Sequence, residues 1–242
     1  MWLSRTRMLF GSEALERLKK ARVAVLGIGG VGGYVVEVLA RSGVGELHLF
    51  DNDVVAETNL NRQIVALRST LGKYKTDVSA SRVADINPSC CIKTFHLFYT
   101  PQNADQIDLS QYDYVADCVD TVAAKAELIR RCTSLGVPII SSMGAGAKTD
   151  ATAFRVGDLS KTKVDPLAKA LRRKLAAEGI RHAKCVWSEE QPVPLHPETF
   201  VNCETKHSGR PVPASNAFVP ATAGLIIGGE IVKDLIGNTV KR

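Results

Sequence analysis

Cationic and acidic side chains that suit phosphate chemistry recur in the first half of the chain. Arg62 and Lys75 carry positive charge, and Asp51, Asp117 and Asp120 carry carboxylates. When the bond between the α- and β-phosphates of a nucleoside triphosphate breaks, negative charge builds on the departing pyrophosphate, and nearby cations stabilise it. A carboxylate holds Mg²⁺ on the phosphates; Asp120 is the first candidate for this role and Asp117 the other. These residues predict a site that binds a nucleoside triphosphate and Mg²⁺.

A glycine-rich turn precedes these residues and provides a place where phosphates approach the backbone. It follows an apolar run at residues 23–26, typical of a buried parallel strand, and leads into residues 34–40, which have helical periodicity. A second strand at residues 46–50 ends in Asp51, where a carboxylate hydrogen-bonds a ribose hydroxyl. A Cβ atom would block both the turn and the phosphate. The glycines expected to cradle the phosphates are Gly27, Gly29, Gly30 and Gly32.

A polar loop after Asp51 distinguishes this chain from an ordinary dinucleotide-binding dehydrogenase. An NAD enzyme keeps its pyrophosphate on the glycine turn and has no need of further cations. The residues beyond Asp51 that we expect to contact the nucleotide are Asp53, Asn59, Asn61, Arg62, Gln63 and Lys75. A nucleoside triphosphate is therefore favoured over NAD. An NAD-binding dehydrogenase and a non-catalytic nucleotide-binding scaffold stay open as alternatives.

Length and composition limit the class of protein. The chain has 242 residues, of which 45% are hydrophobic, and a net charge of +6, which favours an acidic partner. Its six cysteines form no CxxC pair, so we expect no four-cysteine zinc site. We see no disulfide framework and no secretory signal, which favours a cytoplasmic location. Charged residues interrupt the longest apolar stretch, residues 221–236, so we expect no membrane span.

Strands and helices alternate through the first part of the chain. Apolar runs predict further strands at residues 92–98, 112–119 and 137–141. Helical periodicity predicts helices at residues 13–20, capped by Ser12, and at residues 73–86 and 122–135. This alternation predicts an α/β fold, with a doubly wound, mainly parallel, Rossmann-like sheet and helices on both faces.

The C-terminal part is organised differently. Strands are predicted at residues 153–159 and 184–188, and a basic helix at residues 165–178. The proline-rich residues 189–216 are expected to be a long loop, either a lid or disordered. An apolar helix follows at residues 219–236, where small residues would let another helix approach closely: Gly224, Gly228 and Gly229. We expect residues 1–150 to form an ATP-binding core and residues 151–242 to complete the same domain.

The motifs GIGGVGG, DND, TNLNRQ, GKYK and DCVD occur in an order that resembles the adenylating domain of the ubiquitin-activating superfamily. The resemblance covers residues 5–145 and implies that Asp51 binds ribose, Arg62 and Lys75 bind phosphate, and Asp120 positions the metal. It also implies a homodimer in which Arg5 reaches an ATP phosphate in the partner subunit. Such proteins activate a carboxylate by attack on the α-phosphate, which gives an acyl-adenylate.

Later segments are similar to the bacterial tRNA threonylcarbamoyladenosine dehydratase branch. They are SSMGAG (141–146), FRVGDLSKT (154–162), DPLAKALRRKL (165–175) and VPATAGLIIGGEIVKDLI (219–236). This resemblance implies that the substrate is the threonylcarbamoyl group on adenosine 37 of tRNA. Its carboxylate is activated, the group cyclises and water is formally lost. A sulfur-transfer or redox protein is a further candidate partner.

Positive charge between residues 161 and 184 agrees with a tRNA substrate. This stretch has eight Lys or Arg residues against two acids, and phosphate-neutralising cations are what RNA binding needs. The residues expected to bind the nucleic acid are Lys161, Lys163, Lys169, Arg172, Arg173 and Lys174.

An alternative is an adenylyltransferase that activates the C-terminus of a small sulfur-carrier protein. Several such proteins have two CxxC pairs for zinc and a cysteine that accepts the activated carrier. This chain lacks the pairs, although Cys185 and Cys203 stay as candidate nucleophiles. Intramolecular cyclisation needs no enzyme thiol, which favours the tRNA hypothesis.

Overall fold

A seven-stranded sheet forms the centre of the structure, with the strand order β3-β2-β1-β4-β5-β7-β6. In this computed structural model residues 2–196 and 214–237 are described. The strands are β1 (Arg22–Leu26), β2 (Glu46–Phe50), β3 (Cys91–Phe95), β4 (Tyr114–Asp117), β5 (Ile139–Ser142), β6 (Phe154–Asp158) and β7 (Lys184–Ser188). Every neighbouring pair is parallel except β6 and β7, which are antiparallel. The prediction of a mainly parallel sheet is confirmed.

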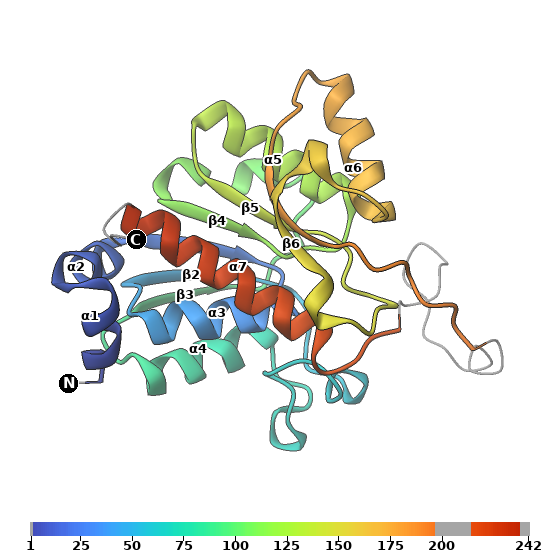
Figure 1. Cartoon of the computed structure of the whole chain (residues 1–242). Coiled ribbons are helices and arrows are strands. Elements are labelled where there is room, and N and C mark those ends of the chain that lie inside the picture. Colours follow the sequence, from blue (N-terminus) through green and yellow to red (C-terminus); the bar gives the residue numbers. More distant parts are fainter. Residues whose placement is uncertain (1, 197–213, 238–242) are drawn as a thin grey trace.

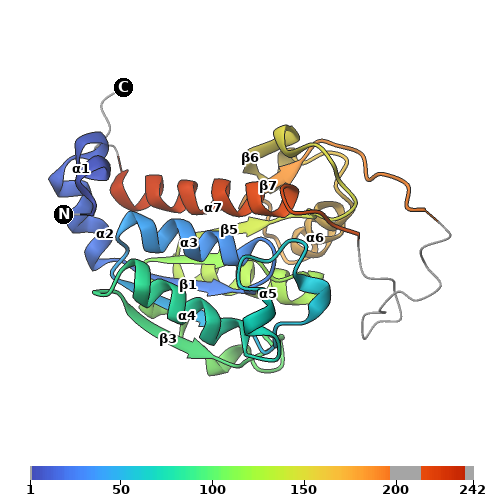
Figure 2. The same ribbon diagram turned by 90° about the horizontal axis from the view of Figure 1, so that it is seen from below.

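Helices cover both faces of this sheet, as Figures 1 and 2 show. On one face α3 contacts both α4 and α7, and on the other α5 packs against α6. The helices are α1 (Ser4–Phe10), α2 (Ser12–Lys20), α3 (Gly32–Ser42), α4 (Lys75–Ile86), α5 (Val122–Leu135), α6 (Pro166–Ala177) and α7 (Val219–Ile236). Short 3₁₀ helices lie at Glu57–Asn59, Arg68–Thr70, Ala104–Gln106, Leu109–Gln111, Ala151–Ala153 and Leu159–Lys161.

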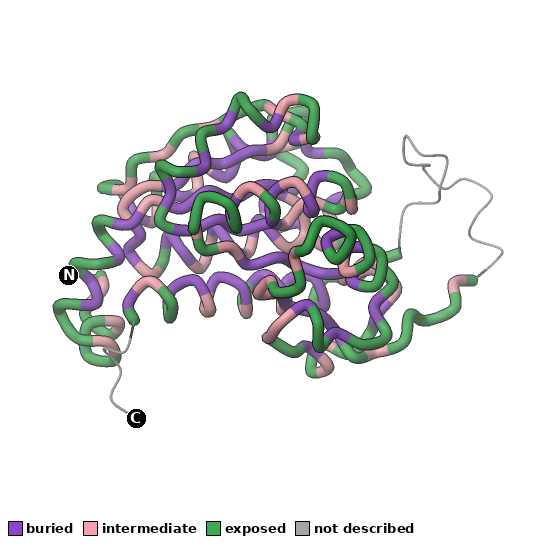
Figure 3. Tube along the Cα trace, turned by 90° about the horizontal axis from the view of Figure 1, so that it is seen from above, coloured by how far each residue is buried: buried purple, intermediate pink, exposed green. Residues whose placement is uncertain are grey.

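The inner strands are buried because helices cover them from both sides. All residues of β4 are buried, as are the last four residues of both β1 and β2. A strand covered on both faces requires continuous apolar sequence rather than alternation, which explains the runs in this chain. β3, at the edge of the sheet, instead alternates between exposed and half-buried positions. Figure 3 shows the buried residues concentrated along the inner strands and the helix faces that cover them.

Helix α7 packs closely on α3 because two of its glycines have no side chain. A Cβ atom on Gly224 would lie 2.3 Å from the carbonyl oxygen of Val31, and one on Gly228 would lie 2.6 Å from the Cβ of Val38. Gly229 points away, into open space. The expectation that small residues here admit another helix is confirmed, and that helix is α3. Among the described residues, no helix is long and apolar enough to cross a membrane.

Several boundaries differ from those predicted. Gly11, not Ser12, is the N-cap of α2, and no side chain caps that helix. Helix α4 begins at Lys75 because Tyr74 is extended and pairs with Val54 in an isolated bridge. The strands β3 and β4 end earlier than predicted, because the residues that follow them turn to line a cavity. Of the loop predicted at residues 189–216, residues 197–213 lie outside the described part of the chain.

The neighbouring glycines of α7 provide a test of its packing on α3. We expect Gly228→Ala to lower the free energy of unfolding by about 1–3 kcal/mol, because the added methyl group collides with Val38. Gly229→Ala is the matched control and should raise that free energy by roughly 0.5–1 kcal/mol through helix propensity alone. Urea unfolding followed by circular dichroism measures both. Equal effects of the two substitutions would contradict the tight contact.

Candidate active site

A cavity of about 590 Å³ opens at the carboxyl ends of β1 and β4. The chain leaves β1 toward β2 and β3 on one side, and continues from β4 toward β5 on the other. Such a switch point separates the loops that follow the two strands and leaves a crevice between them. The position of the cavity therefore follows from the strand order.

The glycine turn after β1 lies against the end of β4. Gly27 has a φ of +89°, and a Cβ atom there would stand 2.7 Å from the carbonyl oxygen of Cys118. A Cβ atom on Gly32 would stand 1.8 Å from the carbonyl oxygen of Gly27. A side chain at Gly27 would force the two loops apart, and one at Gly32 would open the glycine turn itself, which explains both glycines in physical terms.

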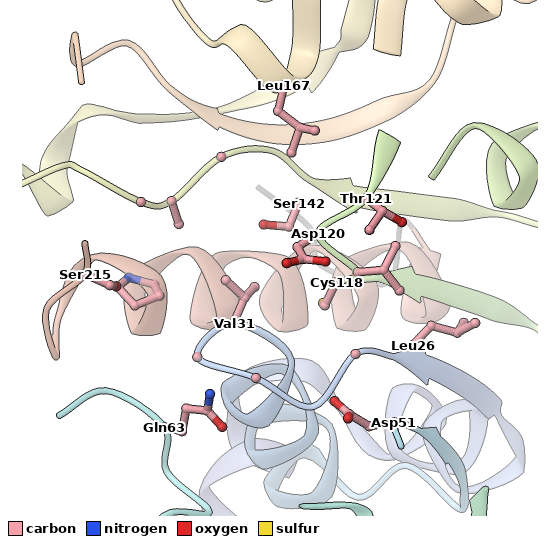
Figure 4. Close-up of a pocket in the computed structure, with 18 of the residues that line it drawn as sticks. Leu26, Val31, Asp51, Gln63, Cys118, Asp120, Thr121, Ser142, Leu167 and Ser215 are labelled. Carbon is pink, nitrogen blue, oxygen red and sulfur yellow. The ribbon is translucent and has the colours of Figure 1, made fainter. Parts of the chain in front are cut away.

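Most of the predicted nucleotide-binding residues line this cavity. They are Gly27, Gly29, Gly30, Asp51, Asp53, Asn59, Arg62, Gln63, Lys75 and Asp120. Gly32 and Asn61 are not among the lining residues; Gly32 shapes the turn, and Asn61 donates to the carbonyl oxygen of Ser215 at 3.0 Å. Figure 4 shows Asp51 and Gln63 on one side of the cavity, with Asp120 and Ser142 across from them.

Asp51 holds the glycine turn in place as well as facing the cavity. Its carboxylate accepts hydrogen bonds from the backbone N–H groups of Ile28, at 2.6 Å, and Asp53, at 2.8 Å. Burial raises the pKa of Asp51, and the Lys75 ammonium and these two N–H groups oppose that rise. The carboxylate is thus fixed at the end of β2 beside the turn.

Lys75 is a buried cation at the start of α4. Its side chain is 6% exposed, and its ammonium lies 2.6 Å from a carboxylate oxygen of Asp53. The backbone also joins these residues, since the N–H of Lys75 donates to the carbonyl oxygen of Asp53. Since this ammonium has one side-chain partner among the described residues, it has donors left for phosphate oxygens in the cavity.

Arg62 is oriented by its own loop. Its guanidinium donates to the carbonyl oxygen of Thr58 and to the side-chain oxygen of Asn61, both at 2.8 Å. Neighbouring Gln63 is buried, and its side-chain oxygen has no hydrogen-bond partner among the described residues. Arg62 and Gln63 therefore present polar atoms to the cavity from a single short loop.

Asp120 is the carboxylate that faces the cavity after β4. Asp117, the other candidate metal ligand, is fully buried and pairs with the fully buried Lys125 at 3.0 Å, so that candidate is wrong. The described residues contain no cluster of three or more metal-ligating side chains. Mg²⁺ usually takes one or two protein carboxylates together with phosphate oxygens and water, and Asp120 fits that pattern.

Arg5 lies away from this cavity within its own chain. It is on α1, and the neighbouring Leu3 lies against Gly43, just past the C-terminal end of α3. The glycine turn is at the opposite end of α3. Because this helix has 11 residues, the turn lies roughly 16 Å from Gly43. Helix α1 has no buried residue in this chain, and its Met8 is 86% exposed.

The second wall of the cavity includes residues that the sequence did not single out. Ser142 lines it from the end of β5, and Gly144 and Lys148 line it from the loop that follows. Asp165 and Leu167 line it from the start of α6. In the sequence, SSMGAG (141–146) stood out only as a segment similar to the dehydratase branch, and Asp165 only as part of another such segment and as the start of the basic helix. The charges of Lys148 and Asp165 are buried through the packing of α6, which no local sequence pattern predicts.

The basic helix α6 and the segment before it present most of the cations predicted to bind nucleic acid to solvent. Lys161, Lys163, Lys169, Arg173 and Lys174 are exposed. Arg172 instead donates to the carbonyl oxygen of Thr162 at 2.5 Å and to the hydroxyl of the same residue. Arg172 therefore fastens α6 to the preceding turn as well as adding charge.

Two of the described cysteines, Cys185 and Cys118, are poor nucleophiles. Cys185, one of the two candidates, is fully buried on β7, and burial raises the pKa of its thiol to about 12. Burial likewise raises the pKa of Cys118, which lines the cavity, to about 12. Since the thiolate is the reactive form, neither side chain suits acyl transfer. The other candidate, Cys203, lies outside the described residues.

Comparison with known proteins places this geometry in a family. The model of the ThiF family matches residues 3–241. The tRNA threonylcarbamoyladenosine dehydratase of Bacillus subtilis is 46% identical over 238 residues, which cover 96% of this chain and 94% of that protein.

Solved structures of the Escherichia coli tRNA N6-threonylcarbamoyladenosine dehydratase have a similar fold. The complex with AMP gives a TM-score of 0.85 at 36% identity and covers 96% of this chain and 92% of that one. The complex with ATP gives the same score and identity, with coverages of 97% and 93%.

An enzyme of the alternative kind is similar over less of the chain. The adenylyltransferase and sulfurtransferase MOCS3 of Xenopus laevis is 37% identical over 132 residues, which cover 54% of this chain and 29% of that protein. The similarity to the dehydratases, by contrast, extends through α6 and α7. The chain therefore belongs to the ThiF family, in the branch that contains the tRNA threonylcarbamoyladenosine dehydratases.

Proposed function

We propose that this protein is an ATP-dependent dehydratase that cyclises the threonylcarbamoyl group of threonylcarbamoyladenosine in tRNA. The single observation that carries the proposal is the cavity at the switch point, where Arg62, Lys75 and Asp120 surround a glycine turn. The near full-length similarity to dehydratases of this specificity supplies the substrate.

The chemistry begins with an attack on ATP. An oxygen of the substrate carboxylate forms a bond to the α-phosphorus, and the bond from that phosphorus to the bridging oxygen breaks. The electron pair leaves with pyrophosphate, and an acyl-adenylate remains. The carbamoyl group then attacks the activated carbonyl carbon and loses a proton to solvent, and AMP leaves. One water is lost from the nucleoside in total.

Each cavity residue has a proposed part in this reaction. The glycine turn cradles the phosphates and Asp51 holds the ribose, as its place at the end of β2 supports. Arg62 and Lys75 stabilise the charge on the leaving pyrophosphate, and Asp120 holds Mg²⁺ against the phosphates. A cytoplasmic location suits a tRNA substrate. A sulfur-transfer or redox partner stays a prediction.

The alternative function is adenylation of the C-terminus of a small sulfur-carrier protein. The cavity suits it equally, because the first step is the same attack of a carboxylate on ATP. The raised pKa of the Cys185 thiol counts against it, as does the shorter similarity to the sulfurtransferase. The dehydratase is therefore the better supported function.

One assay separates the two functions. The protein is incubated with ATP, Mg²⁺ and tRNA that carries threonylcarbamoyladenosine, and the modified nucleoside is weighed by mass spectrometry. We expect loss of one water that requires both ATP and Mg²⁺. An unchanged nucleoside, with ATP–pyrophosphate exchange only when a ubiquitin-like carrier is added, would transfer the assignment to the carrier-activating enzymes.

Arg62 is expected to act mainly on the transition state. Arg62→Ala should lower kcat by about 100-fold or more and change the Kd for ATP only a few-fold, because the charge it offsets develops during reaction. Single-turnover kinetics and equilibrium ATP binding measure the two effects. Arg68→Ala, at an exposed position on the same segment, is the control and should leave both unchanged. Equal losses in turnover and ATP affinity would refute this role.

We further propose a homodimer in which Arg5 completes the cavity of the partner subunit. Two observations support it: Arg5 is far from its own cavity, and α1 buries none of its residues within the chain. An exposed helix that carries large apolar side chains, here Met8 and Leu9, is typical of an interface.

Mixing two inactive variants tests this arrangement. Arg5→Ala and Arg62→Ala should each be inactive, and random exchange of their subunits should restore roughly a quarter of wild-type turnover. The restored activity comes from the one intact cavity of each mixed dimer. If the mixture stays inactive although mixed dimers are detected by native mass spectrometry, Arg5 does not act across an interface.

The exposed cations of α6 should set the salt dependence of tRNA binding. Replacing Lys169, Arg173 and Lys174 by Gln should reduce the slope of log Kd against log salt by about 2 to 3, since each lost phosphate contact removes 0.7–0.9. The control replaces Lys19, Lys20 and Arg41 by Gln, at the other end of the molecule. Identical slopes for the two triple variants would remove α6 from the tRNA-binding surface.

A further inference from the structure

A buried ion pair on the second wall of the cavity has no part in the roles given above. The ammonium of Lys148 lies 3.7 Å from a carboxylate oxygen of Asp165, and the two side chains are 1% and 0% exposed. Both residues line the same cavity as the glycine turn. In Figure 4, Ser142 and Leu167, which flank this pair in the sequence, lie across the cavity from Asp51 and Gln63.

The hydrogen bonds of Asp165 largely satisfy its negative charge without Lys148. One carboxylate oxygen accepts from the N–H of Ala168 and so caps α6; the other accepts from the N–H of Gly144, both at 2.9 Å. The positive end of the α6 dipole stabilises the same carboxylate. Asp165 thus joins the loop after β5 to the start of the basic helix.

Lys148 is less well satisfied than its partner. Among the described residues its ammonium makes one hydrogen bond, to the carbonyl oxygen of Ser188 at 3.3 Å, and Asp165 lies beyond hydrogen-bond distance. An ammonium has three N–H donors, and a buried donor that lacks a hydrogen-bond acceptor lowers the stability of the fold. Donors of Lys148 are therefore available to an oxygen atom placed in the cavity.

The backbone around this pair is held in an unfavourable conformation. Within the described residues, the non-glycine residues with positive φ are Ala147, at +54°, and Val164, at +66°. Each directly precedes one member of the ion pair. A β-branched residue in this region is a true outlier, and such strain concentrates where a structure holds functional groups. The fold thus places Lys148 and Asp165 against local preference.

We propose that Lys148 is a substrate-positioning residue, which donates a hydrogen bond to the substrate carboxylate in the half of the cavity between residues 142–148 and the start of α6. This inference rests on the proposed function. Two anions, a carboxylate and a polyphosphate, must meet in the first step, and a cation on the acyl side offsets their repulsion. Asp165 lies beside the ammonium and connects this wall to α6, the helix that we propose binds tRNA.

The test compares Lys148→Met with Lys93→Met, an exposed control on β3. We expect Lys148→Met to raise the KM for threonylcarbamoylated tRNA by about 10- to 100-fold, the effect of losing one charge-assisted hydrogen bond, with the Kd for ATP within twofold of wild type. Wild-type protein should also bind this tRNA more tightly than unmodified tRNA, and Lys148→Met should bind the two alike. The control should match wild type in every measurement.

Amine rescue distinguishes a positioning role from a purely structural one. Lys148→Ala leaves space for a small amine, and added propylammonium should restore turnover in proportion to its concentration. Lack of rescue in a variant that still binds ATP would overturn the proposal, as would an unchanged KM for tRNA in Lys148→Met or a parallel loss of ATP affinity. Should Lys148→Met not fold, Lys148→Gln, which keeps a neutral donor, replaces it in the same comparison.

A wild-type protein that neither dehydrates the tRNA nor distinguishes the modified form would instead refute the proposed function. The two failures are therefore separate, because the variant is judged only against an active wild type.

Discussion

The close approach of the glycine turn to the end of β4 is the contact on which the cavity depends. A Cβ atom at Gly27 or Gly32 would stand inside the contact distance of a neighbouring carbonyl oxygen. Because the loops after β1 and β4 meet here without side chains between them, backbone N–H groups and the residues after β4 face one space. The strand order then places Asp51 and Asp120 on opposite sides of that space.

Glycines of α7 also help to form the same site, because they let this helix pack closely on α3. Gly224 and Gly228 bring α7 onto α3, and this contact places Pro220, at the start of α7, against the glycine turn. A Cβ atom on Gly30 would lie 3.3 Å from the Cβ of Pro220. Helix α7, the last helix of the described chain, therefore supports the glycine turn that follows β1. Segments that are far apart in the sequence are both needed to form one cavity.

Charge is buried around the cavity in matched form. Asp53 pairs with Lys75, and Asp165 lies beside Lys148. Asp117 pairs with Lys125 in the interior, behind the residues that line the cavity. An unpaired charge at any of these positions except Asp53, whose side chain is 61% exposed, would carry a large desolvation penalty. The pairs differ in how fully they are satisfied: Asp117 and Lys125 are within hydrogen-bond distance, whereas Lys148 keeps donors for the cavity. That difference separates a structural pair from one that suits a substrate.

The sequence by itself determined the helices and strands and most of the predicted nucleotide-binding residues that line the cavity, because these depend on local patterns. Apolar runs, helical periodicity and glycines near Asp51 are readable over short windows, and Arg62 and Lys75 follow at short spacing. Only the tertiary structure decided what depends on contacts between distant segments. Asp117 pairs with Lys125 in the interior, and Arg172 donates to Thr162. The Cys185 thiol is buried, and Lys148 and Asp165 lie together on the second wall of the cavity. The direction of a side chain and its burial depend on what packs against it, and local sequence does not encode that neighbour.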